Sequence, residues 1–272
     1  MMGPNRDGNS TMNERPRACW NRGIQNELSR TNLLDLASGN IPAINIPCFI
    51  EEVTADSLRR IHGGLERGYY KNVVPPITKF GPAVFEYEFA DRKDYFSRAK
   101  ATDELLSSLM KGVLSPLLRF QQRLQELCDL SADIAVDGSH GRYFAGTLRS
   151  IEQGTPVHID FAPHESSPWE MISSVEAQLA ANLYLDTPLD KGNLVIYEKP
   201  WAKDDERHRF ENRFGYDDAV IEATPFEVIK PTDRTLTLFN SRFFHRVEES
   251  RQRRLTYSFF FAFKEDHVIM WS

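Results

Sequence analysis

The second half of the chain, from Arg142 onward, is a succession of short apolar or alternating segments separated by turn-forming residues. The segments read YFAGTLRSI, PVHIDFAP, AQLAANLYLD, GNLVIYEKPW, FEVIK, RTLTLFNS and RRLTYSFFFAF. Between them stand Glu152-Gln153-Gly154, Asp190-Lys191-Gly192, Lys230-Pro231 and Asn240-Ser241. Many short strands punctuated in this way are typical of a β-sandwich or a β-barrel. This half of the chain therefore predicts a core of β-strands.

The sequence before Arg142 has a different texture and predicts mainly helices. Its patterns predict a strand over Ile41–Ile50, helices over Glu51–Tyr70 and Ala101–Cys128, and an extended segment over residues 78–90. Thr54 is a candidate N-cap of the first helix, and Pro116 is expected to kink or split the second. Helices followed by a run of strands predict an α+β fold, a helix-backed β-core. We expect residues 1–17 to be a disordered tail and residues 18–272 to form a single domain.

Length, charge and cysteine content restrict the class of protein. No apolar run in the 272 residues approaches the roughly 20 that span a bilayer, and the polar N-terminus lacks a signal peptide. A net charge of −6 gives no electrostatic reason to bind nucleic acid or an anionic membrane. The three cysteines, Cys19, Cys48 and Cys128, are widely spaced and odd in number, which favours a reducing compartment over a disulfide framework. We therefore expect a cytoplasmic protein with no nucleic-acid or membrane partner, and its oligomeric state is left open.

The segment His158-Ile159-Asp160 is the first with a clear chemical signal. In an extended segment the side chains at i and i+2 lie on one face, so an imidazole and a carboxylate can reach the same metal ion. His245 follows much later, after an apolar strand. Two histidines and one carboxylate form the facial triad of non-haem iron(II) oxygenases, which leaves coordination positions open. We therefore predict that His158, Asp160 and His245 are the metal ligands and the catalytic centre.

Arg254 begins the last long apolar segment, nine residues after His245. Alternation puts Arg254, Thr256 and Ser258 on one face of the predicted strand. A polar stripe on so hydrophobic a strand indicates a lined cavity rather than bulk solvent. A guanidinium with a hydroxyl two residues on can bind a carboxylate through charge-assisted hydrogen bonds. Arg254 therefore stands apart from its neighbours Arg251 and Arg253, which read as a solvated charge run.

Five pieces of the sequence carry a resemblance to a known family. They are KDYF (Lys93–Phe96), TLRSIEQGTPVHID (Thr147–Asp160), LVIYEKPW (Leu194–Trp201), LFNSRFFHRVEE (Leu238–Glu249) and FAFKEDHVIMWS (Phe261–Ser272). From about Gly81 to its end, the chain resembles the iron/2-oxoglutarate aliphatic halogenases of welwitindolinone and hapalindole-type alkaloid pathways, and the related N-succinyl amino-acid hydroxylases. The resemblance implies a double-stranded β-helix, a jelly-roll or cupin-like core, backed by N-terminal helices. It also implies Fe(II), the co-substrate 2-oxoglutarate and O2.

Carried over position by position, the resemblance supports the metal triad and implies that Arg254 anchors 2-oxoglutarate. Arg149 and Thr155 fall in the segment that leads to the first ligand, where such enzymes line the cavity. Together with Thr256 they are candidates for contact with the co-substrate. Arg149 and Thr155 equally fit a structural role in a strand.

Asp160 departs from the halogenase pattern. Those enzymes carry Gly at this position, and the vacancy admits chloride. A carboxylate would occupy the position and repel the anion, so we predict hydroxylation of an aliphatic carbon of a small molecule, an amino-acid or alkaloid-type metabolite. Desaturation or cyclisation at the same iron site, as in natural-product biosynthesis, stays open. A nucleic-acid demethylase is disfavoured by the acidic charge, and a non-catalytic ligand-binding β-barrel by the presence of Asp160, His245 and Arg254 together.

Four aromatic residues are candidates for the substrate wall. Phe161 and Trp169 follow the His158–Asp160 segment, and Phe80 and Phe85 come from a segment that covers the metal mouth in the resembling enzymes. The charged segment Lys203–Arg213 is long enough to lie over the site, and whether it is a mobile lid is left open.

Overall fold

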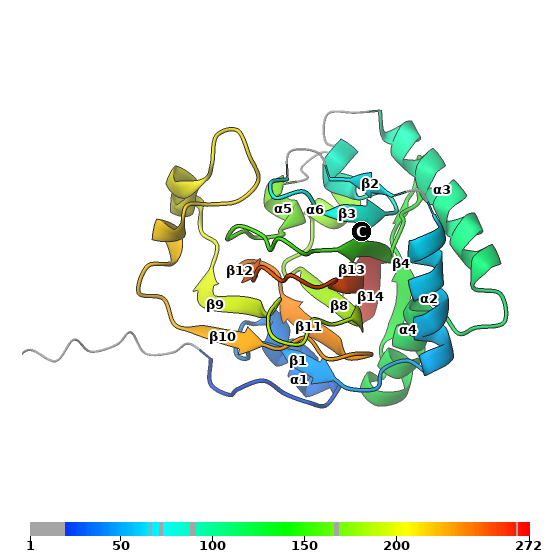
Figure 1. The fold of residues 1–272 in the computed structure, drawn as a ribbon, viewed down its shortest axis with the longest axis horizontal. Coiled ribbons are helices and arrows are strands. Elements are labelled where there is room, and N and C mark those ends of the chain that lie inside the picture. The colour runs from blue at the N-terminus through cyan, green and yellow to red at the C-terminus, as the bar shows by residue number, and fades with distance from the viewer. Residues whose placement is uncertain (1–19, 66, 71–72, 88–90, 166–168, 265) are drawn as a thin grey trace, which may run out of the picture.

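The computed structural model of the chain describes residues 20–65, 67–70, 73–87, 91–165, 169–264 and 266–272, and a nine-stranded sheet is its largest element (Figure 1). In spatial order its strands are β1 (Ile44–Ile46), β11 (Leu236–Asn240), β8 (Leu179–Asp186), β13 (Leu255–Lys264), β7 (Thr147–Ser150), β3 (Thr78–Phe80) and β2 (Gly68–Tyr69), with β14 (His267–Trp271) beside β13 and β4 (Ser131–Ile134) beside β14. Neighbouring strands are antiparallel except for β4 and β14, which run parallel.

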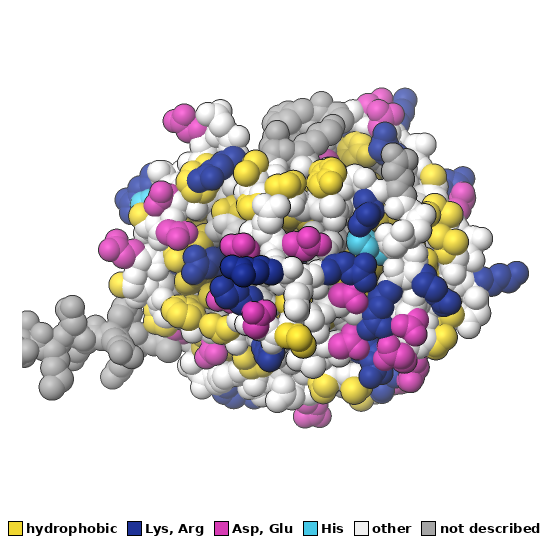
Figure 2. All heavy atoms as spheres, viewed as in Figure 1, with side chains coloured by type: hydrophobic (Ala, Val, Ile, Leu, Met, Phe, Trp, Pro, Cys, Tyr) yellow, Lys and Arg dark blue, Asp and Glu magenta, His cyan; other side chains and the backbone are white. Residues whose placement is uncertain are grey.

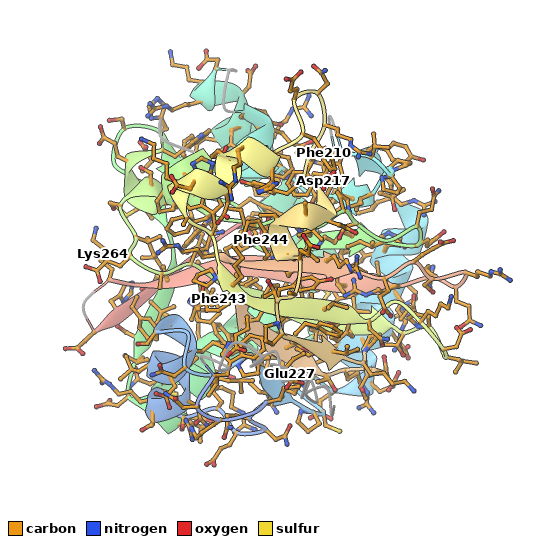
Figure 3. All side chains as sticks on the ribbon, turned by 90° about the vertical axis from the view of Figure 1, so that its left-hand side faces the viewer. Phe210, Asp217, Glu227, Phe243, Phe244 and Lys264 are labelled. Carbon is orange, nitrogen blue, oxygen red and sulfur yellow. The ribbon has the colours of Figure 1, made fainter. Side chains whose placement is uncertain are left out.

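A second, three-stranded sheet has the order β10 (Phe226–Ile229), β9 (Leu194–Pro200) and β12 (Phe243–Val247). β5 (Val136–Asp137) and β6 (Gly141–Arg142) form a separate pair. One hydrophobic cluster joins the two larger sheets, because it contains Leu194 and Ile196 of β9 together with Ala180 of β8 and Phe239 of β11. Neighbouring residues of β12 alternate between sides, with Phe244 on the side of Phe210 and Asp217, and Phe243 on the side of Glu227 (Figure 3). The predicted double-stranded β-helix is confirmed.

The first half of the chain supplies the longer helices. They are α1 (Arg30–Ala37), α2 (Glu52–Gly64), α3 (Arg92–Leu109) and α4 (Pro116–Cys128), with the shorter α5 (Ala162–Glu165), α6 (Glu170–Ser173), η1 (Val84–Tyr87), η2 (Lys203–His208) and η3 (Asp218–Ile221) later or between strands. Pro116 occupies the first turn of α4 behind the N-cap Ser115, whose hydroxyl accepts a hydrogen bond from the Leu118 N–H. The proline therefore splits the predicted long helix, as expected. The N-cap prediction at Thr54 is wrong, because α2 begins two residues earlier and the Thr54 hydroxyl faces the Leu114 carbonyl instead.

The last long strand, β13, shows the predicted alternation. Leu255, Tyr257 and Phe259 are buried in the main hydrophobic core against the helices. Arg254, Thr256 and Ser258 are buried on the opposite side, inside the β-helix. Phe120 of α4 fixes the helix side of this packing, since its ring lies 5.2 Å from the rings of both Phe259 and Phe261.

We expect Phe120→Ala to destabilise the protein by about 3–5 kcal/mol, because a fully buried aromatic side chain is replaced by a cavity. Leu118→Ala is the matched control on the same helix, where the side chain is 46% exposed, and it should cost well under 1 kcal/mol. Urea denaturation followed by circular dichroism measures both. Equal losses at the two positions would contradict the assignment of Phe120 to the core.

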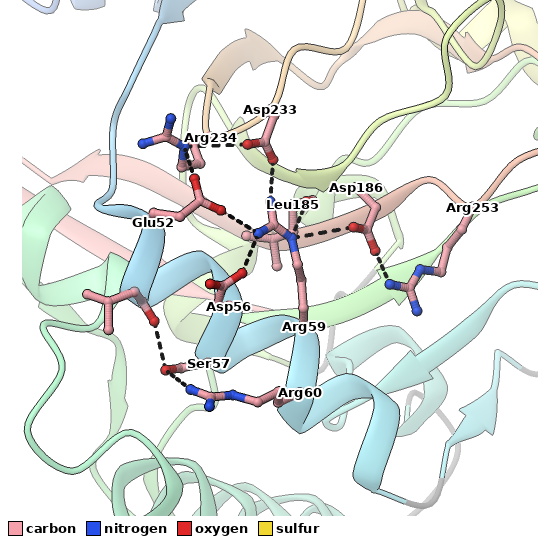
Figure 4. Close-up of polar contacts among 11 residues, drawn as sticks. Glu52, Asp56, Ser57, Arg59, Arg60, Leu185, Asp186, Asp233, Arg234 and Arg253 are labelled. Carbon is pink, nitrogen blue, oxygen red and sulfur yellow. Dashed lines mark hydrogen bonds and ion pairs between the residues drawn. The ribbon is translucent and has the colours of Figure 1, made fainter.

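An ion-pair network fastens α2 to the sheet (Figure 4). The guanidinium of Arg59 pairs with Glu52 at 2.7 Å, Asp56 at 2.8 Å and Asp233 at 2.6 Å, and its Nε donates to the Leu185 carbonyl at 2.8 Å. These partners span the helix, the end of β8 and the turn before β11. Over the α2 side of the face in Figure 2, basic and acidic side chains are accordingly interspersed.

Other expectations concern the periphery. The predicted tail, residues 1–17, lies outside the described residues, and the single domain over residues 18–272 stays a prediction. None of the helices that the structure describes has the length and apolar character needed to cross a bilayer. Cys48 and Cys128 are free thiols, and Cys19 lies outside the described part.

Candidate metal centre

The backbone brings the two predicted histidine ligands side by side. The N–H of His158 donates to the carbonyl of His245 at 2.9 Å, and the N–H of His245 donates to the carbonyl of His158 at 2.9 Å. This doubly hydrogen-bonded antiparallel pair extends the three-stranded sheet beyond β12. Paired residues in such a sheet project to the same side, and the two imidazole rings lie 4.2 Å apart, centre to centre.

Asp160 is fixed by the turn after β11. Its N–H donates to the Ser241 carbonyl at 2.9 Å, and the Ser241 hydroxyl donates to the Asp160 carbonyl at 2.8 Å. Ile159, between the two ligands, points to the other side and is buried in a cluster with Val157 and Phe244. The alternation predicted for the His158–Asp160 segment therefore results from apolar packing on one side and the metal-facing side chains on the other.

The hydrogen bonds of the imidazoles decide which nitrogens face inward. Nδ1 of His158 lies 2.9 Å from the Pro156 carbonyl, and Nδ1 of His245 lies 2.8 Å from the Phe243 carbonyl. A carbonyl only accepts, so each Nδ1 carries the proton and each Nε2 keeps a lone pair for a metal. Nε2 of His245 is 3.5 Å from Oδ2 of Asp160, and ligand atoms of all three residues lie within 4.8 Å of one another. The donor set therefore fits a divalent metal held by two histidines and one carboxylate.

The electrostatics of the cluster keep these groups in their metal-binding protonation states. Burial, followed by the neighbouring His245, lowers the pKa of His158 to about 3, against the opposing effect of Asp160. Burial raises the pKa of Asp160, but the close contact with His245 and the neighbouring His158 and Arg149 outweigh this and lower the pKa to about 2. At neutral pH the site thus offers a neutral imidazole and a carboxylate.

Arg254 lies deep behind the triad and is only 1% exposed. Its Nε donates to the Gly192 carbonyl at 2.9 Å, and its guanidinium lies 5.0 Å from the centre of the Tyr184 ring. Among the described residues, no carboxylate forms an ion pair with it. Burial lowers the pKa of Arg254, with a further decrease from the nearby Arg149, yet an arginine stays protonated at neutral pH. A buried cation without an anionic partner is costly, and it fits a bound carboxylate.

Two neighbouring pockets share Asp160 of the triad as a wall residue. The metal pocket is lined by the three triad residues and Arg254, with Thr155, Asn182, Phe214 and Phe239 among its other walls. The adjoining pocket is lined by Thr147, Gln178, Ser258, Phe260 and Trp271, among others. Tyr70, Phe85, Arg149 and Asp160 line both, so they form the boundary between the pockets.

The structure separates the other predicted site residues into two groups. Phe85, Arg149 and Thr155 line a pocket, and the Thr155 hydroxyl also accepts a hydrogen bond from the Val247 N–H at 2.9 Å. Thr256, Phe80, Phe161 and Trp169 line neither pocket.

The residues outside the pockets have other contacts. The Thr256 hydroxyl accepts a hydrogen bond from Ser258 at 3.0 Å. Trp169 is fully buried in the main core, and its ring lies 5.1 Å from that of Tyr95. Phe161 belongs to the cluster around Ile159, with the Arg242 guanidinium 5.2 Å from its ring. Thr256 therefore contacts the pocket residue Ser258, whereas Trp169 and Phe161 pack in hydrophobic clusters.

Sequence reasoning missed several wall residues. Tyr70 is buried, its ring lies 5.2 Å from that of Phe85, and burial raises the pKa of its hydroxyl to about 12. Asn182 on β8 faces into the metal pocket beside Arg149. Phe214 covers His158, with 4.9 Å between the ring centres. Asn182 is the one polar residue among the buried residues 179–185 of β8, which was a usable signal, whereas Tyr70 and Phe214 lie in connections without periodicity.

The charged segment Lys203–Arg213 lies next to the site. Its first part is η2, which is held by an ion pair between Asp205 and Lys199 at 2.8 Å and by a hydrogen bond from the Trp201 indole N–H to Glu206 at 2.8 Å. Phe214 follows directly in the chain and contacts His158. The residue directly after the segment thus places a ring at the metal pocket, and the question of a mobile lid stays open.

Comparison with known proteins gives a consistent result. A family model described as "Carrier-protein-independent halogenase WelO5" matches residues 27–272. The L-gamma-glutamyl-L-propargylglycine hydroxylase of Streptantibioticus cattleyicolor is 24% identical over 257 residues, which cover 90% of this chain and 93% of the relative. A crystal structure of an N-substituted L-amino acid dioxygenase from Burkholderia ambifaria, in complex with alpha-KG, superposes with a TM-score of 0.62 at 16% identity and covers 89% of this chain and 90% of that one. This structural likeness supports the fold.

Proposed function

Because this chain belongs to the WelO5 family of carrier-protein-independent halogenases, we propose that its metal centre serves an iron(II)/2-oxoglutarate-dependent oxygenase that hydroxylates an aliphatic carbon of a small molecule. The observation that carries hydroxylation over halogenation is the carboxylate of Asp160, 3.5 Å from Nε2 of His245 within the ligand cluster. A third protein ligand with a negative charge leaves no place for a halide at that position.

The chain is an enzyme whose cofactors are Fe(II) and 2-oxoglutarate, with O2 as oxidant. When bound, they supply the chemistry in which 2-oxoglutarate is decarboxylated to succinate and one oxygen atom enters the substrate. His158 and His245 contribute Nε2 lone pairs, which the carbonyls of Pro156 and Phe243 orient through the Nδ1 protons. Arg254, almost fully buried in the wall of the metal pocket, would hold the distal carboxylate of 2-oxoglutarate.

The substrate is a small molecule, and we propose an amino-acid derivative. The names of the hydroxylase relative and of the structurally similar dioxygenase support this class. The adjoining pocket supports it too, because Phe260 and Trp271 give it apolar walls and Thr147 and Gln178 add a few polar groups. Phe85, 39% exposed, stands at the boundary of the two pockets where a substrate would approach.

Mass analysis of the products formed under 18O2 tests this function. The protein is loaded with Fe(II) and 2-oxoglutarate and offered a panel of N-acylated and γ-glutamylated amino acids under 18O2. We expect succinate release and a product heavier by one labelled oxygen atom. A product that has lost two hydrogens instead would assign desaturation or cyclisation to the site, and a chlorinated product would refute the role given to Asp160.

Arg254→Ala should raise the KM for 2-oxoglutarate by roughly a hundred- to several-thousandfold, since removing one partner of a buried charge pair costs about 3–5 kcal/mol. Arg253→Ala is the matched control, because the neighbouring side chain is 46% exposed and pairs with Asp186 outside the pockets. Steady-state succinate release against 2-oxoglutarate concentration measures both. A large increase in KM for Arg253→Ala with none for Arg254→Ala would show that Arg254 is not the 2-oxoglutarate anchor.

A further inference from the structure

Arg149 on β7 lies where the metal pocket meets the adjoining pocket, and we propose that its guanidinium binds a carboxylate of the substrate. The inference rests on the proposed function and narrows its substrate class to small molecules that carry a free carboxylate. It assigns to Arg149 a role in substrate selection rather than in co-substrate binding.

The hydrogen-bond partners of Arg149 fix the plane of its guanidinium without neutralising it. Nε donates to the Ser258 hydroxyl at 3.2 Å, and one terminal nitrogen donates to the Asn182 side-chain oxygen at 2.9 Å. The Tyr70 hydroxyl is a further neutral neighbour. A guanidinium has five N–H donors, so donors remain for another acceptor. A cation held in place by neutral acceptors is pre-organised for a carboxylate, which adds the charge-assisted bonds that these partners do not provide.

The two arginines of the site differ in what they can reach. Arg254 is almost fully buried and lines the metal pocket but not the adjoining one, whereas Arg149 lines both pockets. The two cations are close enough that the charge of Arg149 disfavours the charged form of Arg254. The repulsion between the two guanidinium groups is offset when each of them binds its own anion. 2-Oxoglutarate brings a distal carboxylate to Arg254, so a second anion is left for Arg149.

Within the part of the chain that the structure describes, the side chains that line the adjoining pocket offer Arg149 no paired anion. Among the described side chains that line it, the charged ones are Arg149 and Asp160. The charge of Arg149 helps to lower the pKa of Asp160, but the two form no ion pair, and the Asp160 carboxylate lies 3.5 Å from Nε2 of His245 within the ligand cluster. The other polar wall residues, such as Gln178 and Thr147, are neutral. The charge that complements Arg149 therefore comes with the substrate.

Matched acid and amide probes test the inference. A panel of N-acetyl-L-amino acids, each with its primary carboxamide, is titrated into the holoprotein with Fe(II) and 2-oxoglutarate under nitrogen, and binding is followed by calorimetry. At least one acid should bind about tenfold or more tightly than its amide. Arg149→Gln should reduce that ratio to below about threefold, Arg149→Lys should retain part of it, and the Kd of 2-oxoglutarate should change little. Arg251→Gln, at an exposed arginine outside both pockets, should leave the ratio as in the wild type.

Three results would overturn the inference: no acid of the panel binds, acid and amide bind equally to the wild type, or Arg149→Gln weakens 2-oxoglutarate binding instead of acid binding. Circular dichroism of each variant excludes unfolding as the cause. Failure of the proposed function would differ from all three. A protein that prefers acids over amides through Arg149, yet releases no succinate with any probe, would keep the recognition site and lose the oxygenase assignment.

Discussion

His158→Ala and His245→Ala should each abolish detectable iron binding and reduce 2-oxoglutarate turnover to background. Each removes one Nε2 donor and leaves a single imidazole beside the Asp160 carboxylate, and we expect this pair to hold Fe(II) too weakly for turnover. The fold should persist, because the hydrogen bonds between positions 158 and 245 run between backbone atoms. Iron binding is measured by anaerobic equilibrium dialysis, turnover by succinate release, and the fold by circular dichroism.

His267→Ala is the control for the histidine variants. This imidazole is 36% exposed at the start of β14, and its Nδ1 lies 2.8 Å from the Ser131 hydroxyl. It should bind iron and turn over 2-oxoglutarate as the wild type does. Normal succinate release with substrate in both His158→Ala and His245→Ala would show that the metal site is elsewhere.

Much of the architecture and the position of the cluster were predictable because they follow from local rules. The alternation of residues 254–259 set which side of β13 faces the helices, and the structure confirms it. The spacing of His158 and Asp160 placed both side chains on one face before any tertiary contact was known. The turn at Asn240-Ser241 has two roles. It ends β11 at Asn240, and Ser241 also holds the backbone of Asp160 by hydrogen bonds.

The wall residues of the two pockets were less predictable, because they depend on which loops between strands and helices pass close to the metal site. Trp169 is near Asp160 in sequence, but the short helix α6 begins just after it and its ring turns into the core. Tyr70 is distant in sequence, yet β2 and β3 at the edge of the large sheet bring it to the metal pocket. Phe214 reaches His158 from just after the charged segment Lys203–Arg213, which was expected over the site without any indication of which ring would enter it. Sequence patterns report the face of a strand, whereas loop paths are set by tertiary packing.

Asp160→Gly should convert the centre from hydroxylation toward halogenation. The change removes one negative ligand and opens a coordination position, and a halide would restore the lost charge. The backbone at position 160 should keep its course, because its N–H and carbonyl are both held by Ser241. The two histidines keep their orientation through the carbonyls of Pro156 and Phe243, so the remaining ligands stay in place.

We expect Asp160→Gly to lose most hydroxylation and, with excess chloride or bromide, to give some halogenated product with a substrate identified by the panel. Halogenation need not dominate, since the outcome also depends on how the substrate C–H bond is held relative to the metal. Asp160→Ala is the matched variant, and its methyl group should crowd the halide and lower the yield. Mass spectrometry of the products from the wild type and both variants, with and without halide, measures the effect. Chlorination by the wild type would refute the hydroxylase assignment, whereas undiminished hydroxylation by Asp160→Gly would show that the Asp160 carboxylate is not a ligand.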